Sequence, residues 1–476
     1  MKNLISRDRE FSVLDLMYTS EKSEFVALYG RRRVGKTFLI RSAFKDKFSF
    51  QLTGLANATL SQQLSNFHLA LSGHDSKNDY PPAKDWLTAF SQLSEYLATI
   101  NGRKVIFIDE LPWFDTRNSK FIQGLEHFWN SWASARNDIV LIACGSATSW
   151  MINKLINDKG GLHNRVTKKI KLLPFTLFEC EKYLQSRKIK LDRYQIVQLY
   201  MTFGGIPFYW DELEPGLSAM QNIENICFSE TGLLRTEFIN LYRSLFSNHE
   251  RHLSLIRALA KKSKGLTREE LISLSGLPNA GSTTKLINEL EESGFIRKYI
   301  PFGKKTRNSL YQLVDFYTHF YLKFIEGTQP MDKNNWVNSI DTPKYRAWSG
   351  YAYEQICMYH LAQIKQALGI GGVHSTVSSW RSNASDPGAQ VDLVIDRRDQ
   401  VINLCEIKFS INPYTITKKY ASDLRNQIGA FKQETGTRKS VFLTMITTWG
   451  VQQNIHSTGL IQNELKMDNL FCEAQF

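Results

Sequence analysis

The stretch "LYGRRRVGKTFLI", Leu28 to Ile40, constrains the chain more than any other. It fits the pattern G-x-x-x-x-G-K-[ST], with Gly30, Gly35, Lys36 and Thr37 at the defined positions. An apolar run precedes it and a helical pattern follows it, which is the context that a phosphate-binding loop requires. Glycines let such a loop turn its N–H groups toward phosphate oxygens, and the helix N-terminus adds positive potential. The residues expected to contact a nucleotide are Gly30, Arg31, Arg32, Arg33, Val34, Gly35, Lys36, Thr37 and Phe38.

A second motif supplies the acidic half of the same site. The run "VIFIDE" ends a strand pattern with Asp109 and Glu110. In phosphoryl transfer, Lys36 would reach the β- and γ-phosphates, while Thr37 and Asp109 would hold Mg²⁺. Glu110 would orient or deprotonate the attacking water. Both motifs, in this order and each after a strand, predict a P-loop NTPase that uses ATP and Mg²⁺.

Short apolar runs alternate with helical patterns up to about residue 170. The runs at 24–30, 104–110 and 138–146 are strand-like, and 83–100 is helical, which predicts a parallel sheet. Ser146 at the end of the third run is either a sensor of the γ-phosphate or a simple strand end. Arg165 is either an arginine finger or part of a solvated basic patch. Residues 54–82 are polar and end in two prolines, so we expect a mobile loop there.

Composition limits the classes of protein that remain. A chain of 476 residues with 42% apolar residues is long enough for about three domains. The formal charge of +13 is compatible with an acidic partner such as DNA. The six cysteines form no close pairs, and no apolar run is long enough to cross a membrane. We therefore expect a reduced, cytoplasmic protein without a membrane partner; a homo-oligomer is compatible with this class.

Residues 250 to 313 have the pattern of a winged helix. Three helical stretches, the second opened by a capping box at Thr267 and Glu270, precede a hairpin pattern. The third helix becomes acidic toward its end, whereas the hairpin is basic. This module either touches DNA or only packs against its neighbours. The residues that would contact DNA are Lys285, Arg297, Lys298, Lys304, Lys305 and Arg307.

Near the C-terminus, two strand patterns carry charges that a buried strand does not need. "QVDLVI" and "VINLCEIKF" are joined by a turn-rich segment and predict a hairpin. Residues two apart share a face, so Glu406 and Lys408 lie together and Asp392 can reach them. Two carboxylates this close call for a cation, and Mg²⁺ suits such oxygen ligands. The set is suited to metal-assisted phosphodiester hydrolysis, with Asp392, Glu406 and Lys408 as catalytic residues.

Five motifs in order, "GRRRVGKT", "FIDELPWF", "GSATSWM", "LPFTLFE" and "GGIPFYW", resemble the archaeal-type ATPases of the AAA+/STAND lineage. The resemblance covers roughly the first 320 residues and implies an α/β ATPase core, a helical lid and a winged helix. In such proteins an R-x-x-E element lies by the adenine. Here that element is Arg7 and Glu10.

The C-terminal spacing D-x₁₃-E-x-K resembles the restriction-endonuclease-like PD-(D/E)xK nucleases. Val391 stands where those proteins often have proline. The resemblance implies that Glu354, on an aromatic-rich helix before the hairpin, faces the metal. It also implies that Gln427, on the helix after the hairpin, belongs to the residues that contact nucleic acid. Lys418, Lys419 and Arg425 would contact nucleic acid near Gln427.

The sequence therefore predicts an α/β multidomain protein. Its expected parts are a P-loop parallel-sheet ATPase core (1–170), a helical lid (171–248), a winged helix-turn-helix (249–325) and an α/β restriction-endonuclease-like domain (335–476). The leading hypothesis is an ATPase coupled to a Mg²⁺-dependent nuclease acting on DNA. Two alternatives stay open: a nucleotide switch whose last domain only binds or packs, and a DNA-binding regulator that uses the winged helix.

Overall fold

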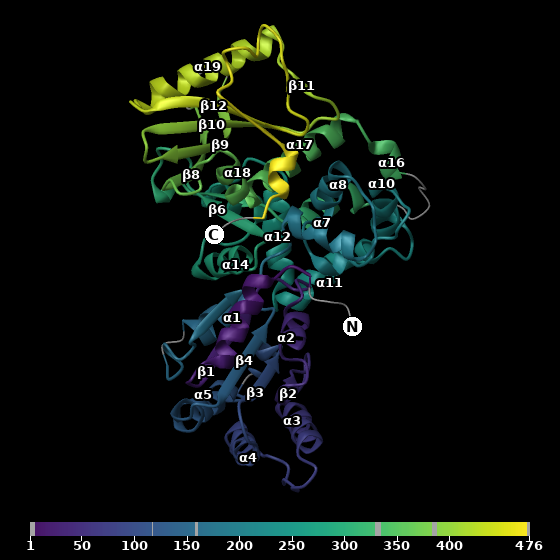
Figure 1. Ribbon diagram of the computed structural model, residues 1–476, viewed down its shortest axis with the longest axis vertical. Helices are drawn as coiled ribbons and strands as arrows, with labels where there is room; N and C mark the ends of the chain where they lie inside the picture. Colours follow the sequence, from purple (N-terminus) through teal and green to yellow (C-terminus); the bar gives the residue numbers. More distant parts are fainter. Residues whose placement is uncertain (1–4, 117, 158–159, 329–334, 383–387, 474–476) are drawn as a thin grey trace. The chain divides into compact units, whose positions relative to one another are not determined.

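A computed structural model of the chain describes residues 5–116, 118–157, 160–328, 335–382 and 388–473 (Figure 1). Its contacts divide the chain into two compact units, Met1–Pro174 and Phe175–Phe476. The four domain boundaries expected from the sequence remain predictions. Within the described ranges, no helix has the length and apolar character needed to cross a lipid bilayer.

The first unit is built on a five-stranded parallel sheet with strand order β2-β3-β4-β1-β5. The three expected runs are confirmed as β1, β3 and β4. The central strands are buried on both faces, as a sheet covered on both sides requires. The strands are β1 (Glu24–Tyr29), β2 (Phe48–Thr53), β3 (Lys104–Asp109), β4 (Ile139–Gly145) and β5 (Lys168–Lys171).

Helices cover both faces of this sheet (Figure 1). On one face, α3, α4 and α5 bury an aromatic cluster in which Trp86 packs edge-on against Phe114 and Phe121. On the other face, Phe44 of α2 contacts Tyr18 of α1. The helices are α1 (Asp8–Thr19), α2 (Lys36–Phe44), α3 (Leu60–His74), α4 (Trp86–Ala98), α5 (Phe121–Ser131) and α6 (Thr148–Trp150).

The expected loop at 54–82 is wrong, because α3 occupies much of it. Thr59 and Gln62 form a capping box: the Thr59 hydroxyl accepts from the Gln62 N–H, and the Gln62 amide oxygen accepts from the Thr59 N–H. Leu64, Phe67 and Leu71 recur at helical spacing and are all buried. Polar residues on the exposed face hid this pattern in the sequence.

The second unit begins with helices. The short segment 204–206 separates α8 from α9, which begins at Pro207. Three helices, α12 to α14, then precede the antiparallel pair β6 and β7, and α13 begins with the expected Thr267–Glu270 capping box. The elements are α7 (Leu177–Ser186), α8 (Arg193–Phe203), α9 (Pro207–Trp210), α10 (Ala219–Ile223), α11 (Leu233–Leu245), α12 (His249–Ala260), α13 (Arg268–Ser275), α14 (Gly281–Glu292), β6 (Ile296–Tyr299), β7 (Leu310–Leu313), α15 (Phe316–Phe320) and α16 (Asn335–Ser339).

The rest of this unit is a mixed sheet with order β14-β12-β10-β9-β8. Strands β9 and β10 form the expected hairpin, and β10 pairs in parallel with β12. Helix α19 packs through Phe431 on one face, and α17 contacts β10 (Figure 1). The elements are α17 (Pro343–Tyr359), α18 (Leu361–Ala367), β8 (Ser375–Arg381), β9 (Gln390–Arg397), β10 (Val401–Lys408), β11 (Tyr414–Thr415), α19 (Lys418–Thr435), β12 (Ser440–Thr447), β13 (Val451–Gln452) and β14 (Asn463–Lys466).

Candidate functional site

The loop between β1 and α2 has the backbone that its glycines allow. Gly30 has φ 143° and Gly35 has φ 90°, both in the region that side chains disfavour. A Cβ on Gly30 would lie 2.3 Å from the carbonyl oxygen of Leu172. Gly30 is therefore required both for the turn and for the close approach of the segment after β5.

Lys36 is the buried cation of this loop. Its ammonium donates to the carbonyl oxygens of Gly30 at 3.0 Å and Arg31 at 2.9 Å. The residue is 5% exposed, and desolvation lowers its pKa, against the opposing charges of Glu110 and Asp109. An ammonium held by two carbonyls keeps capacity for an anion, because it has three donors.

The acidic residues lie where the second motif predicts. The Thr37 hydroxyl donates to an Asp109 carboxylate oxygen at 2.7 Å, so the two expected metal ligands are in contact. Glu110 follows with φ 48°, a left-handed backbone that costs energy in a non-glycine residue. The Ser146 hydroxyl donates to its carboxylate at 3.0 Å. The structure thus brings together four predicted residues: Thr37 from helix α2, Asp109 and Glu110 from the end of β3, and Ser146 from the end of β4.

The other predicted nucleotide-site residues are placed as follows. Arg31, Arg32 and Arg33 are partly exposed in the loop, Val34 is buried and Phe38 is 44% exposed. Arg7 is buried directly before α1 and donates to the carbonyl of Leu173 at 2.8 Å, one residue beyond the contact of Gly30. Glu10 lies one turn later. Arg165 is exposed, and no hydrogen bond or ion pair joins its side chain to the loop in the described residues.

These residues fit a nucleotide with Mg²⁺. The loop offers a cation and backbone N–H groups for phosphates, and the Thr37–Asp109 pair offers hard oxygen ligands. The strained Glu110 carboxylate lies beside Ser146, at the carboxyl ends of β3 and β4. In open α/β sheets, ligands bind at this edge.

A second cluster lies on β9 and β10. The antiparallel register pairs Cys405 with Leu393, and its continuation puts Glu406 opposite Asp392 on one face. The Asp392 carboxylate accepts from the Ile407 N–H at 3.4 Å. Lys408 donates to Glu406 at 2.7 Å, as the shared face predicts.

Helix α19 completes the surroundings of Glu406. The Tyr420 hydroxyl donates to this carboxylate at 2.9 Å, and the Gln427 amide donates to it at 3.4 Å. Gln427 also donates to the carbonyl of Gln390. Tyr420 was not predicted, because nothing in the sequence distinguishes it from the chain's other tyrosines. Gln427 was expected at this place.

Burial and mutual repulsion shape the ionisation of this cluster. Desolvation, with the charge of Glu406, raises the pKa of Asp392 to about 7. Desolvation, with the charge of Asp392, raises the pKa of Glu354 on α17 well above its usual value. Burial disfavours the Lys408 ammonium, but the Glu406 carboxylate outweighs it, so the pKa of Lys408 is raised. The carboxylates of this cluster therefore carry more negative charge, when ionised, than the neighbouring cations neutralise.

The fit of this cluster to a divalent metal rests on two carboxylates. Among the residues that the structure describes, no group of three or more His, Cys, Asp or Glu side chains is placed so that it could hold a metal ion. Asp392 and Glu406 remain as a facing pair, and Mg²⁺ is commonly held by one or two carboxylates with water and substrate phosphate. The pair fits that mode of binding. Glu354 is close enough to interact electrostatically with Asp392, but it is not part of a three-ligand group.

The residues expected to contact nucleic acid fall into two groups. Arg297 does not lie with the exposed hairpin cations, because its guanidinium donates to Gln312 at 2.8 Å and Gln355 at 3.0 Å inside a cavity. Gln427, which was also expected to contact nucleic acid, is buried beside Glu406. The others are exposed: Lys285, Lys298, Lys304, Lys305, Arg307, Lys418, Lys419 and Arg425. Of these, Lys285 lies 3.9 Å from Glu289 on α14, which reduces its value as a phosphate ligand.

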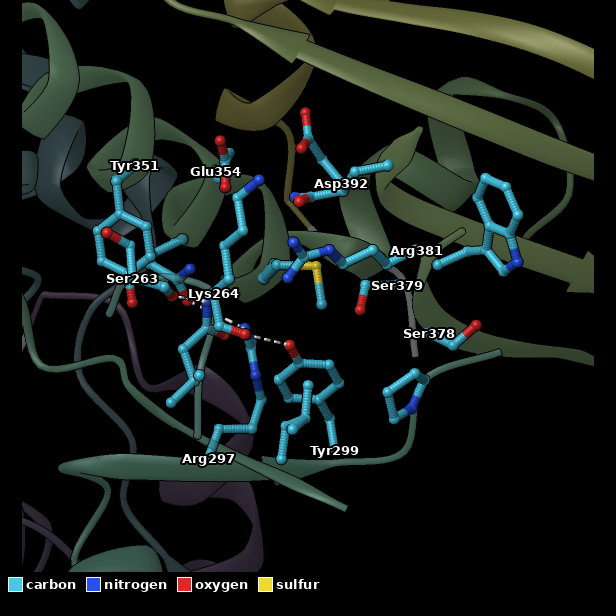
Figure 2. Close-up of a pocket in the computed structure, with 18 of the residues that line it drawn as sticks. Ser263, Lys264, Arg297, Tyr299, Tyr351, Glu354, Ser378, Ser379, Arg381 and Asp392 are labelled. Carbon is cyan, nitrogen blue, oxygen red and sulfur yellow. Dashed lines mark hydrogen bonds between the residues drawn. The ribbon is translucent and has the colours of Figure 1, made fainter. Parts of the chain in front are cut away.

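A cavity of about 1160 Å³ opens beside Asp392 and Glu354 (Figure 2). Lys264, from the turn between α12 and α13, and Arg381, at the end of β8, also line it. Neither residue was predicted. The "KKSKG" stretch was interpreted only as a helix end, and β8 has no motif of its own. Proximity in the fold, not a sequence signal, reveals them.

Comparison with known proteins agrees with the first site. Residues 4–213 match the family described as an ATPase domain predominantly from Archaea. An uncharacterized protein of Methanocaldococcus jannaschii is 22% identical over 433 residues, covering 88% of this chain and 90% of that protein. The Walker-type ATPase of Pyrococcus abyssi superposes with a TM-score of 0.50 at 15% identity, over 67% of this chain and 96% of that one. These matches support a P-loop ATPase fold in the N-terminal part of the chain, and the loop expected to bind nucleotide, residues 30–38, lies within the matched segment.

Proposed function

We propose that the chain is an ATP-hydrolysing ATPase coupled to a Mg²⁺-dependent nuclease that acts on DNA. The ATPase part follows from its fold and loop. The observation that carries the nuclease part is the cluster on β9 and β10, where Asp392 faces Glu406 and Lys408 contacts Glu406 at 2.7 Å. Two facing carboxylates with an adjacent ammonium match the needs of phosphodiester hydrolysis.

In the ATPase part, each residue has a role that its contacts support. Lys36, at the base of the loop, would neutralise phosphate charge that develops during transfer. Thr37 and Asp109 would hold Mg²⁺. Glu110 would position the attacking water, and the hydrogen bond from Ser146 fixes the Glu110 carboxylate.

In the nuclease part, Asp392 and Glu406 would hold the metal, which supplies an activated water and neutralises the scissile phosphate. Lys408 would orient that water or stabilise the leaving group. Tyr420 and Gln427 would keep Glu406 in one orientation through their hydrogen bonds. Exposed lysines at the start of α19, Lys418 and Lys419, are suited to backbone contacts with DNA.

We propose a winged helix for α12 to α14 with β6 and β7. Its order of three helices and an antiparallel pair supports that assignment. Lys304, Lys305 and Arg307 are exposed between the two strands, as a DNA-contacting wing requires. The domain boundaries at 170, 248 and 325 and the homo-oligomer remain part of the same proposal.

A second candidate is a nucleotide switch whose last domain only binds or packs. It is favoured by Glu406, whose carboxylate is already satisfied by Lys408, Tyr420 and Gln427. The third candidate, an operator-reading regulator, is disfavoured by Glu289 on α14, because an acidic helix repels the phosphate backbone.

The deciding experiment is a cleavage assay on the full chain with Mg²⁺ or Mn²⁺, with and without ATP, on supercoiled, linear and branched DNA. We expect wild-type cleavage and its loss in Asp392→Asn and Lys408→Ala. Asp396→Asn is the matched control, because Asp396 lies on the same strand but pairs with Lys439 at 2.6 Å. Equal cleavage by wild type and Asp392→Asn would refute the nuclease and favour the switch.

A further inference from the structure

The cavity beside the acidic cluster has walls from four segments of the second unit. They are the turn between α12 and α13, the β6–β7 pair, helix α17, and strands β8 and β9 (Figure 2). Its volume is about 1160 Å³, at the upper end of ligand-binding pockets. Glu354, Asp392 and Ile407 form part of its lining, so the cavity leads to the acidic cluster.

Six cationic side chains line this cavity, and four have partners. Lys262 pairs with Glu270 at 2.8 Å, Arg346 pairs with Asp341 at 2.7 Å, Arg297 donates to two amides, and Lys298 lies over the ring of Tyr311. The other two are Lys264 and Arg381. Within the described residues, neither side chain has a hydrogen bond or an ion pair. A cation without a partner in a cavity is available to an anionic ligand.

Both of these cations point at the acids. Figure 2 shows the Lys264 side chain extending upward so that its ammonium lies between Glu354 and Asp392, with Arg381 directed into the same space. The positive charge of Lys264 acts on both carboxylates, lowering the pKa of each against the larger effect of burial. Lys264 therefore partly balances the two acids, together with Lys408.

This arrangement suits a phosphodiester backbone. A phosphate next to two carboxylates needs cations to offset the repulsion, and Lys264 and Arg381 supply them from two different walls. Of the acids, Glu354 and Asp392 line the cavity and are partly exposed, and Glu406, opposite Asp392, is only 7% exposed. A protein that reads a duplex inserts an element into a groove about 12 Å wide, whereas here the protein surrounds its ligand. A single strand can enter such a space, since its backbone is accessible from all sides.

We propose that this cavity binds an unpaired nucleic-acid strand, with Lys264 and Arg381 as its phosphate ligands, and presents the strand to Asp392. The functional consequence of this binding site rests on the proposed nuclease, whose substrate would then contain a single-stranded segment. Strand binding itself requires neither cleavage nor ATP.

The test measures binding of the full chain in EDTA, which prevents cleavage. Fluorescence anisotropy compares labelled single-stranded DNA, single-stranded RNA of the same sequence and a blunt duplex across a range of salt. We expect a single strand, of DNA, RNA or both, to bind more tightly than the duplex. Lys264→Ala and Arg381→Ala should each weaken single-strand binding and make the dependence of log K on log salt less steep by about 0.7 per lost phosphate contact.

Two variants control for charge and folding. Lys262→Ala removes one positive charge two residues away, but Lys262 is paired with Glu270, so we expect a smaller change in the salt slope. Lys264→Arg keeps the charge and should retain binding. Two results would overturn the proposal. One is a salt dependence of binding that neither alanine variant changes. The other is tighter binding of the duplex than of the single strand, with the same loss of affinity in both alanine variants. If strands bind as expected but are never cleaved with metal, the nuclease fails and the strand site stands.

Discussion

At the P-loop the chain buries a cation, whereas on β9 and β10 it buries anions. Lys36 is 5% exposed and donates to two backbone carbonyls, so its ammonium keeps a third donor for phosphate. Asp392 and Glu406 face each other with Glu354 nearby, and the positive charges of Lys408 and Lys264 offset theirs only in part, so this site favours a cationic ligand. Each site is built for a ligand of the opposite sign.

This difference explains why the sequence predicts the P-loop site more completely than the site on β9 and β10. The backbone carbonyls that hold Lys36 come from its own loop, which is contiguous in the chain. Asp392 needs a partner strand, a helix and a turn from distant segments, so its chemistry depends on packing.

The largest effect is expected at the P-loop. Lys36→Ala removes the charge that would stabilise the transferring phosphoryl group, so ATP turnover should fall at least about 100-fold. ATP binding should weaken as well, because the ammonium contacts the phosphates in the bound state. Steady-state phosphate release and a nucleotide-binding titration measure the two effects.

Glu110→Gln separates binding from chemistry at the same site. It keeps the shape of the side chain but removes the base, so turnover should be lost while nucleotide binding is kept. Turnover at the wild-type rate in Glu110→Gln would refute the role assigned to Glu110. If basal DNA cleavage survives in both variants but no longer responds to ATP, the two sites are coupled as proposed.

The next effect concerns stability at the acidic cluster. The pKa of Asp392 in the fold is about 7, above the ordinary value of 3.8, so the folded state favours the protonated acid. Stability is therefore lost as pH rises from about 4 through 7, and the loss is complete above that window. Asp392→Asn should raise the free energy of unfolding by about 2 kcal/mol at pH 8 in EDTA.

Urea denaturation at pH 8 and at pH 4 measures this change. The gain should vanish at pH 4, where the native acid is already protonated. Asp396→Asn on the same strand should show no gain at pH 8, because it removes a carboxylate paired with Lys439. A loss of stability in Asp392→Asn at pH 8 would mean that Lys264 and Lys408 already neutralise the cluster.

Much of the fold could be predicted from local patterns. Strands β1, β3 and β4, the capping box at Thr267 and the β9–β10 hairpin each leave a contiguous signature. Strand β8 was missed because it borders the sheet and alternates little, with six of its seven residues at least partly exposed. Its neighbour in the sheet, not its own sequence, makes it a strand.

The candidate sites divide in the same way. Glu406 and Lys408 follow from the two-residue period of a strand, and Glu354 and Gln427 from a resemblance. Lys264, Arg381 and Tyr420 could not be found, because their roles arise only when separate segments pack around Asp392 and Glu406. Arg297 was wrongly grouped with the exposed hairpin cations, because a sequence does not tell which strand face is covered.

The smallest effect is expected at helix α3, which was not predicted from the sequence. Thr59→Ala removes the side-chain half of the capping box of α3, so the first unit should lose about 1 kcal/mol of stability. Ser65→Ala, on the exposed face of the same helix, is the matched control; alanine favours helix, so it should be neutral or slightly stabilising. Thermal unfolding followed by circular dichroism compares the two. Because α3 buries Leu64, Phe67 and Leu71 against the sheet behind the P-loop, equal behaviour of the two variants would mean that packing alone fixes the start of α3.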